Sequence, residues 1–273
     1  ERTIASAESE IAIPAASLGA ATSVVVTVTR ASGTSAFSNV VAITSLLVVD
    51  TDKVSEAGKT SLWDAINNAN SIGGSQTITF NLPVGSIIDA SSAPLPAITT
   101  PIFVDGPGAS SLTIAGGGTS ADGLVFTAST DGSRVDGLTF RGFGGAAIRI
   151  FSAGVTVETS VFDGDAVGVA LRGAGNHVLD NEFRASTTAG VLIDGAAATG
   201  NEVYENTFDS NAVGVLVQNA SGNRIGAEGR GNTIRDNAQA GVFIQAGAQN
   251  SVVYNLFEGR NGQAPSPAPP VPP

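Results

Sequence analysis

The sequence predicts an all-β protein whose main body is a right-handed parallel β-helix of about seven to nine coils. Three observations predict this fold class: short apolar strand segments recur every 21 to 27 residues, a second apolar column keeps step with them, and Gly and Asn recur at fixed places between the strands. Each repeat is then one coil of short parallel strands that buries its apolar face only against its neighbours.

The first apolar column consists of residue pairs in i, i+2 alternation, which is the period of a strand with one buried face. These pairs are Leu124 and Phe126, Ile148 and Ile150, Val169 and Leu171, Val191 and Ile193, Val215 and Val217, and Val242 and Ile244. The second column is Phe140, Phe162, Phe183, Phe208, Ile234 and Phe257. This period is shorter than helix-pair repeats of about 33 to 47 residues or propeller blades, and the consensus of leucine-rich repeats is missing. Less regular strands at residues 77–80 and 102–104 extend the pattern upstream.

Glycine and asparagine mark the corners between the predicted strands. Four glycines precede the strand, where we expect a tight corner that needs positive φ or a close backbone approach: Gly168, Gly190, Gly214 and Gly241. Asparagines come in pairs five residues apart: Asn176 with Asn181, Asn201 with Asn206, and Asn250 with Asn255. Asn223 and Asn232 are nine apart, which indicates a four-residue insertion. We expect stacked Asn side chains to satisfy backbone groups and each other, and a ligand-binding ladder is the weaker alternative.

A short amphipathic helix is predicted over residues 60–70, before the regular coils. Leu62, Ala65, Ile66 and Ala69 have helical spacing, and Thr60 or Ser61 can act as N-cap. Because the first coil of a solenoid has an exposed apolar end, a helix with the chain's single Trp is expected to cover that end. We therefore divide the chain into a β-strand segment at 1–45, the β-helix at 46–263 and a Pro-rich tail at 264–273.

The N-terminal segment is predicted to form a β-hairpin. Residues 24–29 and 36–41 are strongly strand-forming, with Gly33 in the turn. The stretch resembles the last two strands of an immunoglobulin- or fibronectin-like module, although 45 residues are too few for a whole sandwich of about 100. Either the rest of a module lies upstream, or the strands pair with the solenoid or with a neighbouring subunit. The residues expected to take part in assembly are Val24, Val26, Val28, Phe37, Pro269 and Pro270.

Composition limits the setting and the partners of the chain. The absence of Met indicates that an upstream signal or longer region precedes Glu1, and the absence of Cys leaves stability to the core. A net charge of −11 disfavours nucleic acid and anionic membranes, and no apolar run long enough to insert into a bilayer is present. We expect a secreted protein, extracellular or at a cell surface.

Residues that could perform catalysis are sparse. Polysaccharide enzymes with β-helix folds need several acidic residues together with a supporting His, Arg or Lys, but this chain has only His177 and no Lys in its coils. Most Asp residues adjoin Gly or Asn, where Asp is a usual corner residue. We therefore assign no catalytic residue and predict no cofactor. Calcium is left open, with Asp163, Asp165 and Asp180 as weak candidate ligands.

The opening segment carries a family resemblance. Leu47-Val48-Val49-Asp50-Thr51, followed by the segment at 60–66 and by Ala69-Asn70, resembles the start of bacterial CSLREA-type, pectate-lyase-like β-helix surface proteins. Trp63 stands where Arg is usual in that family, and the Cys is missing. The resemblance covers residues 46–263 and implies the fold and a secreted or cell-surface setting, with no particular chemistry.

These features favour an extracellular structural or adhesive protein, a subunit of a fibre or sheath assembled head to tail. The expected partners are further copies of the chain, joined through the N-terminal strands and the Pro-rich tail, and surface glycans. The alternative is a module that binds or degrades polysaccharides, with lyase or hydrolase chemistry.

Overall fold

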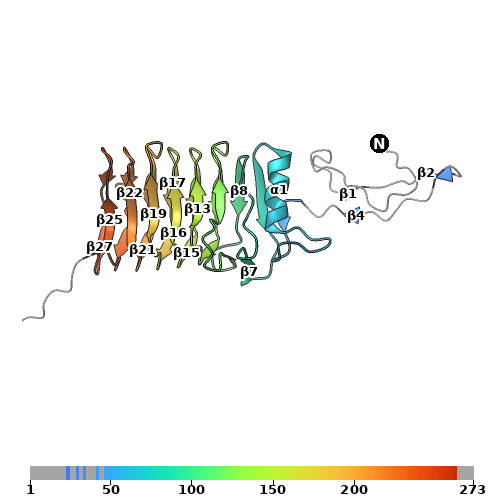
Figure 1. Ribbon diagram of the computed structural model, residues 1–273, viewed down its shortest axis with the longest axis horizontal. Helices are drawn as coiled ribbons and strands as arrows, with labels where there is room; N and C mark the ends of the chain where they lie inside the picture. Colours follow the sequence, from blue (N-terminus) through green and yellow to red (C-terminus); the bar gives the residue numbers. More distant parts are fainter. Residues whose placement is uncertain (1–22, 25–28, 31–32, 35–40, 43–45, 263–273) are drawn as a thin grey trace, which may run out of the picture.

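Short strands of alternating burial build three parallel sheets that run along one axis (Figure 1). The computed structural model describes residues 23–24, 29–30, 33–34, 41–42 and 46–262, with side chains from residue 46 onward. The chain passes from the nine-stranded sheet to the eight-stranded sheet and then to the six-stranded sheet before it begins the next coil. The eight-stranded sheet corresponds to eight coils, so the predicted parallel β-helix and its length are confirmed.

The strands of each sheet are given in chain order. The nine-stranded sheet contains β5 (Val48–Val49), β6 (Gln76–Phe80), β8 (Ile102–Asp105), β11 (Arg134–Asp136), β14 (Thr156–Glu158), β17 (His177–Leu179), β20 (Glu202–Tyr204), β23 (Arg224–Ile225) and β26 (Ser251–Val252). The eight-stranded sheet contains β7 (Ser86–Asp89), β9 (Leu112–Ala115), β12 (Thr139–Arg141), β15 (Val161–Asp163), β18 (Glu182–Arg184), β21 (Thr207–Asp209), β24 (Thr233–Arg235) and β27 (Leu256–Glu258). The six-stranded sheet contains β10 (Leu124–Phe126), β13 (Ala146–Ile150), β16 (Val167–Leu171), β19 (Ala189–Asp194), β22 (Val213–Gln218) and β25 (Ala240–Ile244).

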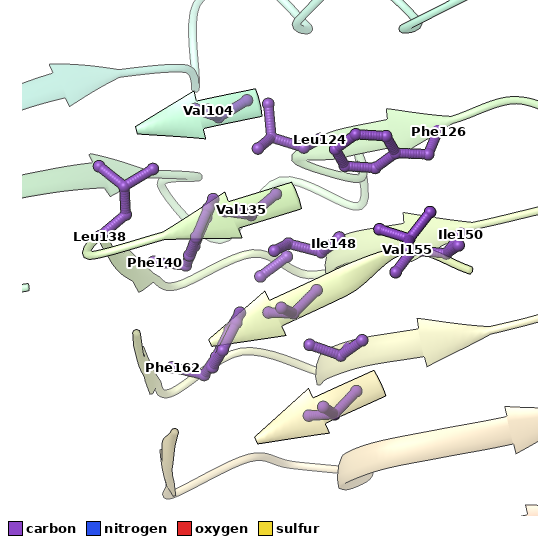
Figure 2. Close-up of a cluster of buried hydrophobic side chains, with 14 of the residues drawn as sticks. Val104, Leu124, Phe126, Val135, Leu138, Phe140, Ile148, Ile150, Val155 and Phe162 are labelled. Carbon is purple, nitrogen blue, oxygen red and sulfur yellow. The ribbon is translucent and has the colours of Figure 1, made fainter. Parts of the chain in front are cut away.

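The strand register places the two predicted apolar columns inside the solenoid. Leu124 pairs with Ile148, and the column continues in register to Val242. Figure 2 shows how Ile148 and Phe140 lie in the buried interior, with Phe162 one coil beyond Phe140. Burial of apolar side chains is the dominant favourable term in folding. This chain has no cysteine, so no disulfide adds to it.

Phenylalanine rings stack along the axis in the second column. The ring centroids of Phe140, Phe162, Phe183 and Phe208 are 5.3, 4.7 and 4.9 Å apart in succession, with interplanar angles of 6 to 7°. Isolated aromatic pairs prefer offset or edge-to-face geometry. Here the strand spacing of about 4.8 Å sets the distance between rings, so the sheet register imposes the stack.

The single described helix, α1 (Leu62–Ile72), begins two residues after the predicted segment 60–70 and ends two residues beyond it. Ser61 is the N-cap of a capping box with Asp64, which fixes the start. The helix buries Leu62, Trp63, Ala65, Ile66 and Ala69, and lies at the N-terminal end of the stack (Figure 1). Among the described residues, no helix is long and apolar enough to span a membrane.

The N-terminal strands form two small antiparallel pairs. β1 (Ser23–Val24) pairs with β4 (Val41–Ala42), and β2 (Thr29–Arg30) pairs with β3 (Gly33–Thr34). Gly33 therefore lies in a strand and not in the turn. Each pair is a separate two-stranded sheet and joins none of the three solenoid sheets.

Candidate functional site

Three columns of polar side chains run along the corners of the solenoid, one at each corner of the coil. The first corner column precedes the nine-stranded sheet and contains Asn176, Asn201, Asn223 and Asn250. The second, between the nine- and eight-stranded sheets, contains Asn181, Asn206, Asn232 and Asn255. The third precedes the six-stranded sheet and contains Asp165, Ser186, Asn211, Asn237 and Asn261.

Each asparagine before the last coil binds its neighbour one coil further along the axis. The backbone N–H of Asn201 and its Nδ2 both donate to Oδ1 of Asn223, at 3.0 and 2.9 Å. Side-chain Nδ2 atoms also donate to backbone carbonyls, as Asn206 does to Val178 and Tyr204, each at 2.9 Å. Buried amide groups without partners would cost about 1–3 kcal/mol each. The columns thus satisfy the hydrogen-bonding groups at the corners, and the Asn side chains have a structural role there.

Residues with positive φ precede most of the column asparagines, and they occur at all three corners. Three of them come directly before asparagines of the second column and are not glycine: Asp180 (φ 54°), Glu205 (φ 60°) and Tyr254 (φ 58°). This left-handed conformation costs free energy for side chains other than Gly and Asn. The hydrogen bonds that follow at each corner hold the backbone there.

Sequence reasoning missed the third corner column. Its signal is present, since Asn211 follows Asn206 by five residues and Asn237 follows Asn232 by five. In the coil that carries the predicted insertion, Ala227 and Arg230 form an antiparallel bridge within a small loop, and Asn223 and Asn232 keep their places in their columns.

The four predicted corner glycines lie inside strands, which corrects their placement before the strand. Gly168, Gly190, Gly214 and Gly241 belong to β16, β19, β22 and β25, and none has positive φ. A Cβ at Gly190 would lie 2.8 Å from Cδ1 of Phe208 and 2.9 Å from the carbonyl oxygen of Gly214. Close approach to the phenylalanine stack and to the next coil is therefore the reason for glycine at these positions.

Asp165 is the most perturbed acidic residue of the described chain. It is fully buried, and its Oδ1 accepts the N–H of Phe143 at 2.8 Å, while its Oδ2 has no partner among the described residues. Burial raises the pKa of Asp165 to about 7, with a smaller contribution from the charge of Asp163. A carboxyl group here is a proton-binding group in a column otherwise built from neutral side chains.

The candidate calcium ligands do not come together. Asp163 lies 3.2 Å from Arg184 in an ion pair, Asp165 is buried in its corner, and Asp180 borders a shallow open hollow with Glu182 and Glu205. In the part of the chain that the structure describes, no group of three or more His, Cys, Asp or Glu side chains is arranged to hold a metal ion. Calcium binding at these three residues stays a prediction.

Arginine and carboxylate side chains pair across neighbouring coils on the outer surface. The pairs are Arg149 with Asp122, Arg172 with Asp194, Arg184 with Asp163, Arg230 with Glu205, and Arg235 with Asp209. Arg149 makes two hydrogen bonds to Asp122, at 2.6 and 2.8 Å. Burial tends to raise the pKa of Asp122, but the Arg149 guanidinium and the Ala146 N–H outweigh it, so that pKa is lowered. His177 begins β17, with its Nδ1 3.4 Å from Oε2 of Glu202.

The two ends of the solenoid differ. At the N-terminal end, α1 buries its apolar face against the first strands, and Trp63 Nε1 donates to the Pro94 carbonyl at 3.0 Å. At the C-terminal end, large apolar side chains are exposed: Phe243, Ile244, Val252, Tyr254, Leu256 and Phe257. Of the expected assembly residues, Val24 lies in β1, whereas Val26, Val28, Phe37, Pro269 and Pro270 lie outside the described residues.

Parallel strands in three sheets, stacked apolar columns and polar corner ladders define the class of parallel β-helix proteins. Residues 122–265, just over half of the chain, match the family model described as the right handed beta helix region, and the chain belongs to this family. No curated protein matches the chain.

Solved structures show similarity at low identity. The A-module of the Azotobacter vinelandii mannuronan C-5 epimerase AlgE4 is 14% identical, with 72% of this chain and 71% of that chain covered and a TM-score of 0.41. The catalytic domain of a GH87 α-1,3-glucanase in complex with nigerose is 15% identical, with 80% and 56% covered and a TM-score of 0.27. Likeness at this level carries no conclusion about activity.

Proposed function

We propose that this protein is an extracellular structural module in which the β-helix serves as a stiff rod within a fibre or sheath at a cell surface. One observation carries the proposal: the interior and all three corners are committed to contacts along the axis. The phenylalanine stack and the asparagine columns use the core side chains and corner amides to join each coil to the next.

The arrangement suits a load-bearing element. Coils in a solenoid contact only their neighbours, so stability adds up along the axis. From Asn176 onward, each coil boundary combines strand hydrogen bonds, apolar contacts and corner hydrogen bonds, without a disulfide. These three kinds of contact together support a rod that keeps its length outside the cell.

Assembly of the purified full chain tests the proposal. Light scattering over a range of protein concentrations and negative-stain electron microscopy should show linear particles with the width of one solenoid. Binding to surface glycans, the adhesive part of the proposal, is measured separately on a glycan array. Monomers at every concentration and ionic strength would contradict the fibre.

The alternative is a module that binds or degrades polysaccharides. The shallow hollow bordered by Asp180, Glu182 and Glu205 is an acidic surface open to such a ligand. A screen for new reducing ends and unsaturated products over acidic and neutral glycans tests this alternative. Activity that disappears in the Asp180→Asn, Glu182→Gln double variant would favour it over the structural role.

A further inference from the structure

We propose that the last coil, residues 240–262, is an acceptor end that binds the β1–β4 strand pair of a second copy of this chain. Copies then join head to tail. The inference rests on the proposed function and gives the fibre a specific contact.

The apolar interior of the last coil is open to solvent. Ile244, Val252 and Phe257 continue columns whose previous members, Val217, Ile225 and Ile234, are 0% exposed. Their own side chains are 37, 37 and 50% exposed. A solenoid end of this kind is covered by another element in stable proteins, as α1 covers the opposite end here.

The last coil also presents unpaired backbone groups. β25, β26 and β27 are each the terminal strand of a sheet, with a neighbour on one side only. In the corner columns, each Asn N–H donates to the next Asn along the axis, but those of Asn250, Asn255 and Asn261 have no acceptor among the described residues. A partner of the last coil must therefore supply carbonyl groups, as a peptide strand does, because an apolar surface alone leaves these asparagine N–H groups without acceptors.

The β1–β4 pair fits this requirement. It is an isolated two-stranded sheet in the described residues, and such a pair is marginally stable in water without a further partner. The sequence from Ser23 continues as a run of Val and Thr residues, the composition of a strand that packs on an apolar surface. Adding this pair to an edge strand gives it a third strand.

Chain length excludes docking of this pair on the last coil of its own molecule. β5 and β26 are the two edges of the nine-stranded sheet, so eight spacings of about 4.8 Å put about 38 Å between them. Only five residues lie between Ala42 and Val48, and the six Cα steps that join them reach at most about 22 Å when fully extended. The acceptor end can therefore receive this strand pair only from another copy, and each copy keeps a free donor and a free acceptor. Such a heterologous contact propagates as a linear polymer.

Two other occupants fit less well. The tail at 264–273 contains six prolines, and proline has no N–H to donate to a strand ladder. Two acceptor ends placed face to face would set the N–H groups of their corner asparagines against each other. Both alternatives remain measurable outcomes.

Complementary variants of the full chain test the contact. Val24→Pro combined with Val41→Pro removes strand donors from the β1–β4 pair and leaves the last coil intact. Phe257→Asp places a charge on the acceptor end and leaves the N-terminal strands intact. Phe151→Asp is the matched control, because Phe151 is 45% exposed in the middle of the solenoid.

We expect each blocked variant to be monomeric by light scattering, an equimolar mixture of the two to stop at dimers, and the control to assemble like the wild type. Circular dichroism and thermal unfolding verify folding, and Val252→Lys is the second acceptor variant if Phe257→Asp unfolds. Dimers of the strand-blocked variant alone would overturn the inference in favour of face-to-face ends. If both blocked variants still assemble, or if assembly is lost only when the tail is deleted, the proposed contact between the last coil and the β1–β4 pair is wrong. Neither result contradicts the proposed fibre. A wild type that never associates overturns both.

Discussion

Asp165 and Ser186 occupy the third corner column in consecutive coils, and each leaves one fully buried oxygen without a hydrogen-bond partner in the described structure. The Thr187 N–H donates to the Asp165 carbonyl at 2.9 Å, which fixes the two corners in register. Further along the column, Asn211 Nδ2 donates to the Phe183 carbonyl and to Asn237 Oδ1, each at 3.0 Å. The two residues are thus the point where the asparagine column is incomplete.

Asp165→Asn is expected to stabilise the protein at neutral and alkaline pH. The folded-state pKa of Asp165 is about 7, above about 3.9 for an unfolded chain, so the folded protein holds an extra proton between these values. Wild-type stability should fall as pH rises from about 4 through 7, by up to about 4 kcal/mol, and then level off. Urea unfolding between pH 4 and 9 measures this slope.

The slope from Asp165 should vanish in Asp165→Asn. It should persist, slightly reduced, in the control Asp163→Asn, which loses a partly exposed ion pair with Arg184 and the small contribution of the Asp163 charge to the pKa of Asp165. Equal pH profiles for wild type and Asp165→Asn would show that the buried carboxyl does not take up the proton.

Asn206→Ala is expected to lower the free energy of unfolding by roughly 2–4 kcal/mol. The substitution leaves the backbone N–H of Asn181 and the carbonyls of Val178 and Tyr204 without the buried partners that Asn206 supplies. Chemical denaturation measures the loss. The exposed helical residue Asn67 is the control, and its change to Ala should be neutral or slightly stabilising. Similar effects at both positions would argue against the role of the column.

Gly190→Ala is expected to destabilise the protein by about 1–3 kcal/mol, because its new Cβ would press on the Phe208 ring and the Gly214 carbonyl. Gly222→Asn provides the contrast. Gly222 has φ 70° with open space around it, and Asn tolerates this left-handed conformation. Thermal melts should show a lower Tm for the first variant and a Tm near that of the wild type for the second.

Trp63→Ala is expected to cost about 3–5 kcal/mol, because it removes the largest side chain of the N-terminal cap. Trp63→Phe should lower the free energy of unfolding by only about 1 kcal/mol, since it keeps most of the apolar surface and loses the hydrogen bond to Pro94. Denaturant titrations followed by circular dichroism compare the two variants. If both lose the same stability, the cap depends on the indole N–H and not on its apolar surface.

Much of the solenoid could be predicted because its determinants repeat. The Val169 and Phe162 columns have a period in the sequence that the strand register reproduces. Boundaries at the helix were less accurate, since Thr60 and Ser61 are both acceptable N-caps and only the reciprocal bonds between Ser61 and Asp64 decide between them. The glycines in the strands were misplaced because a requirement for space and a requirement for positive φ look alike in a sequence.

The sequence by itself determined the coil period, the two apolar columns and the N-terminal helix, because these depend on local alternation and spacing. The tertiary structure decided which asparagines form the third column, that Asp163, Asp165 and Asp180 form no group arranged to hold a metal ion, and that Ile244, Val252 and Phe257 are open to solvent. The physical reason is that hydrogen-bond partners and burial at a corner are set by residues one coil away. That distance is a few ångströms in the fold and more than twenty residues in the chain.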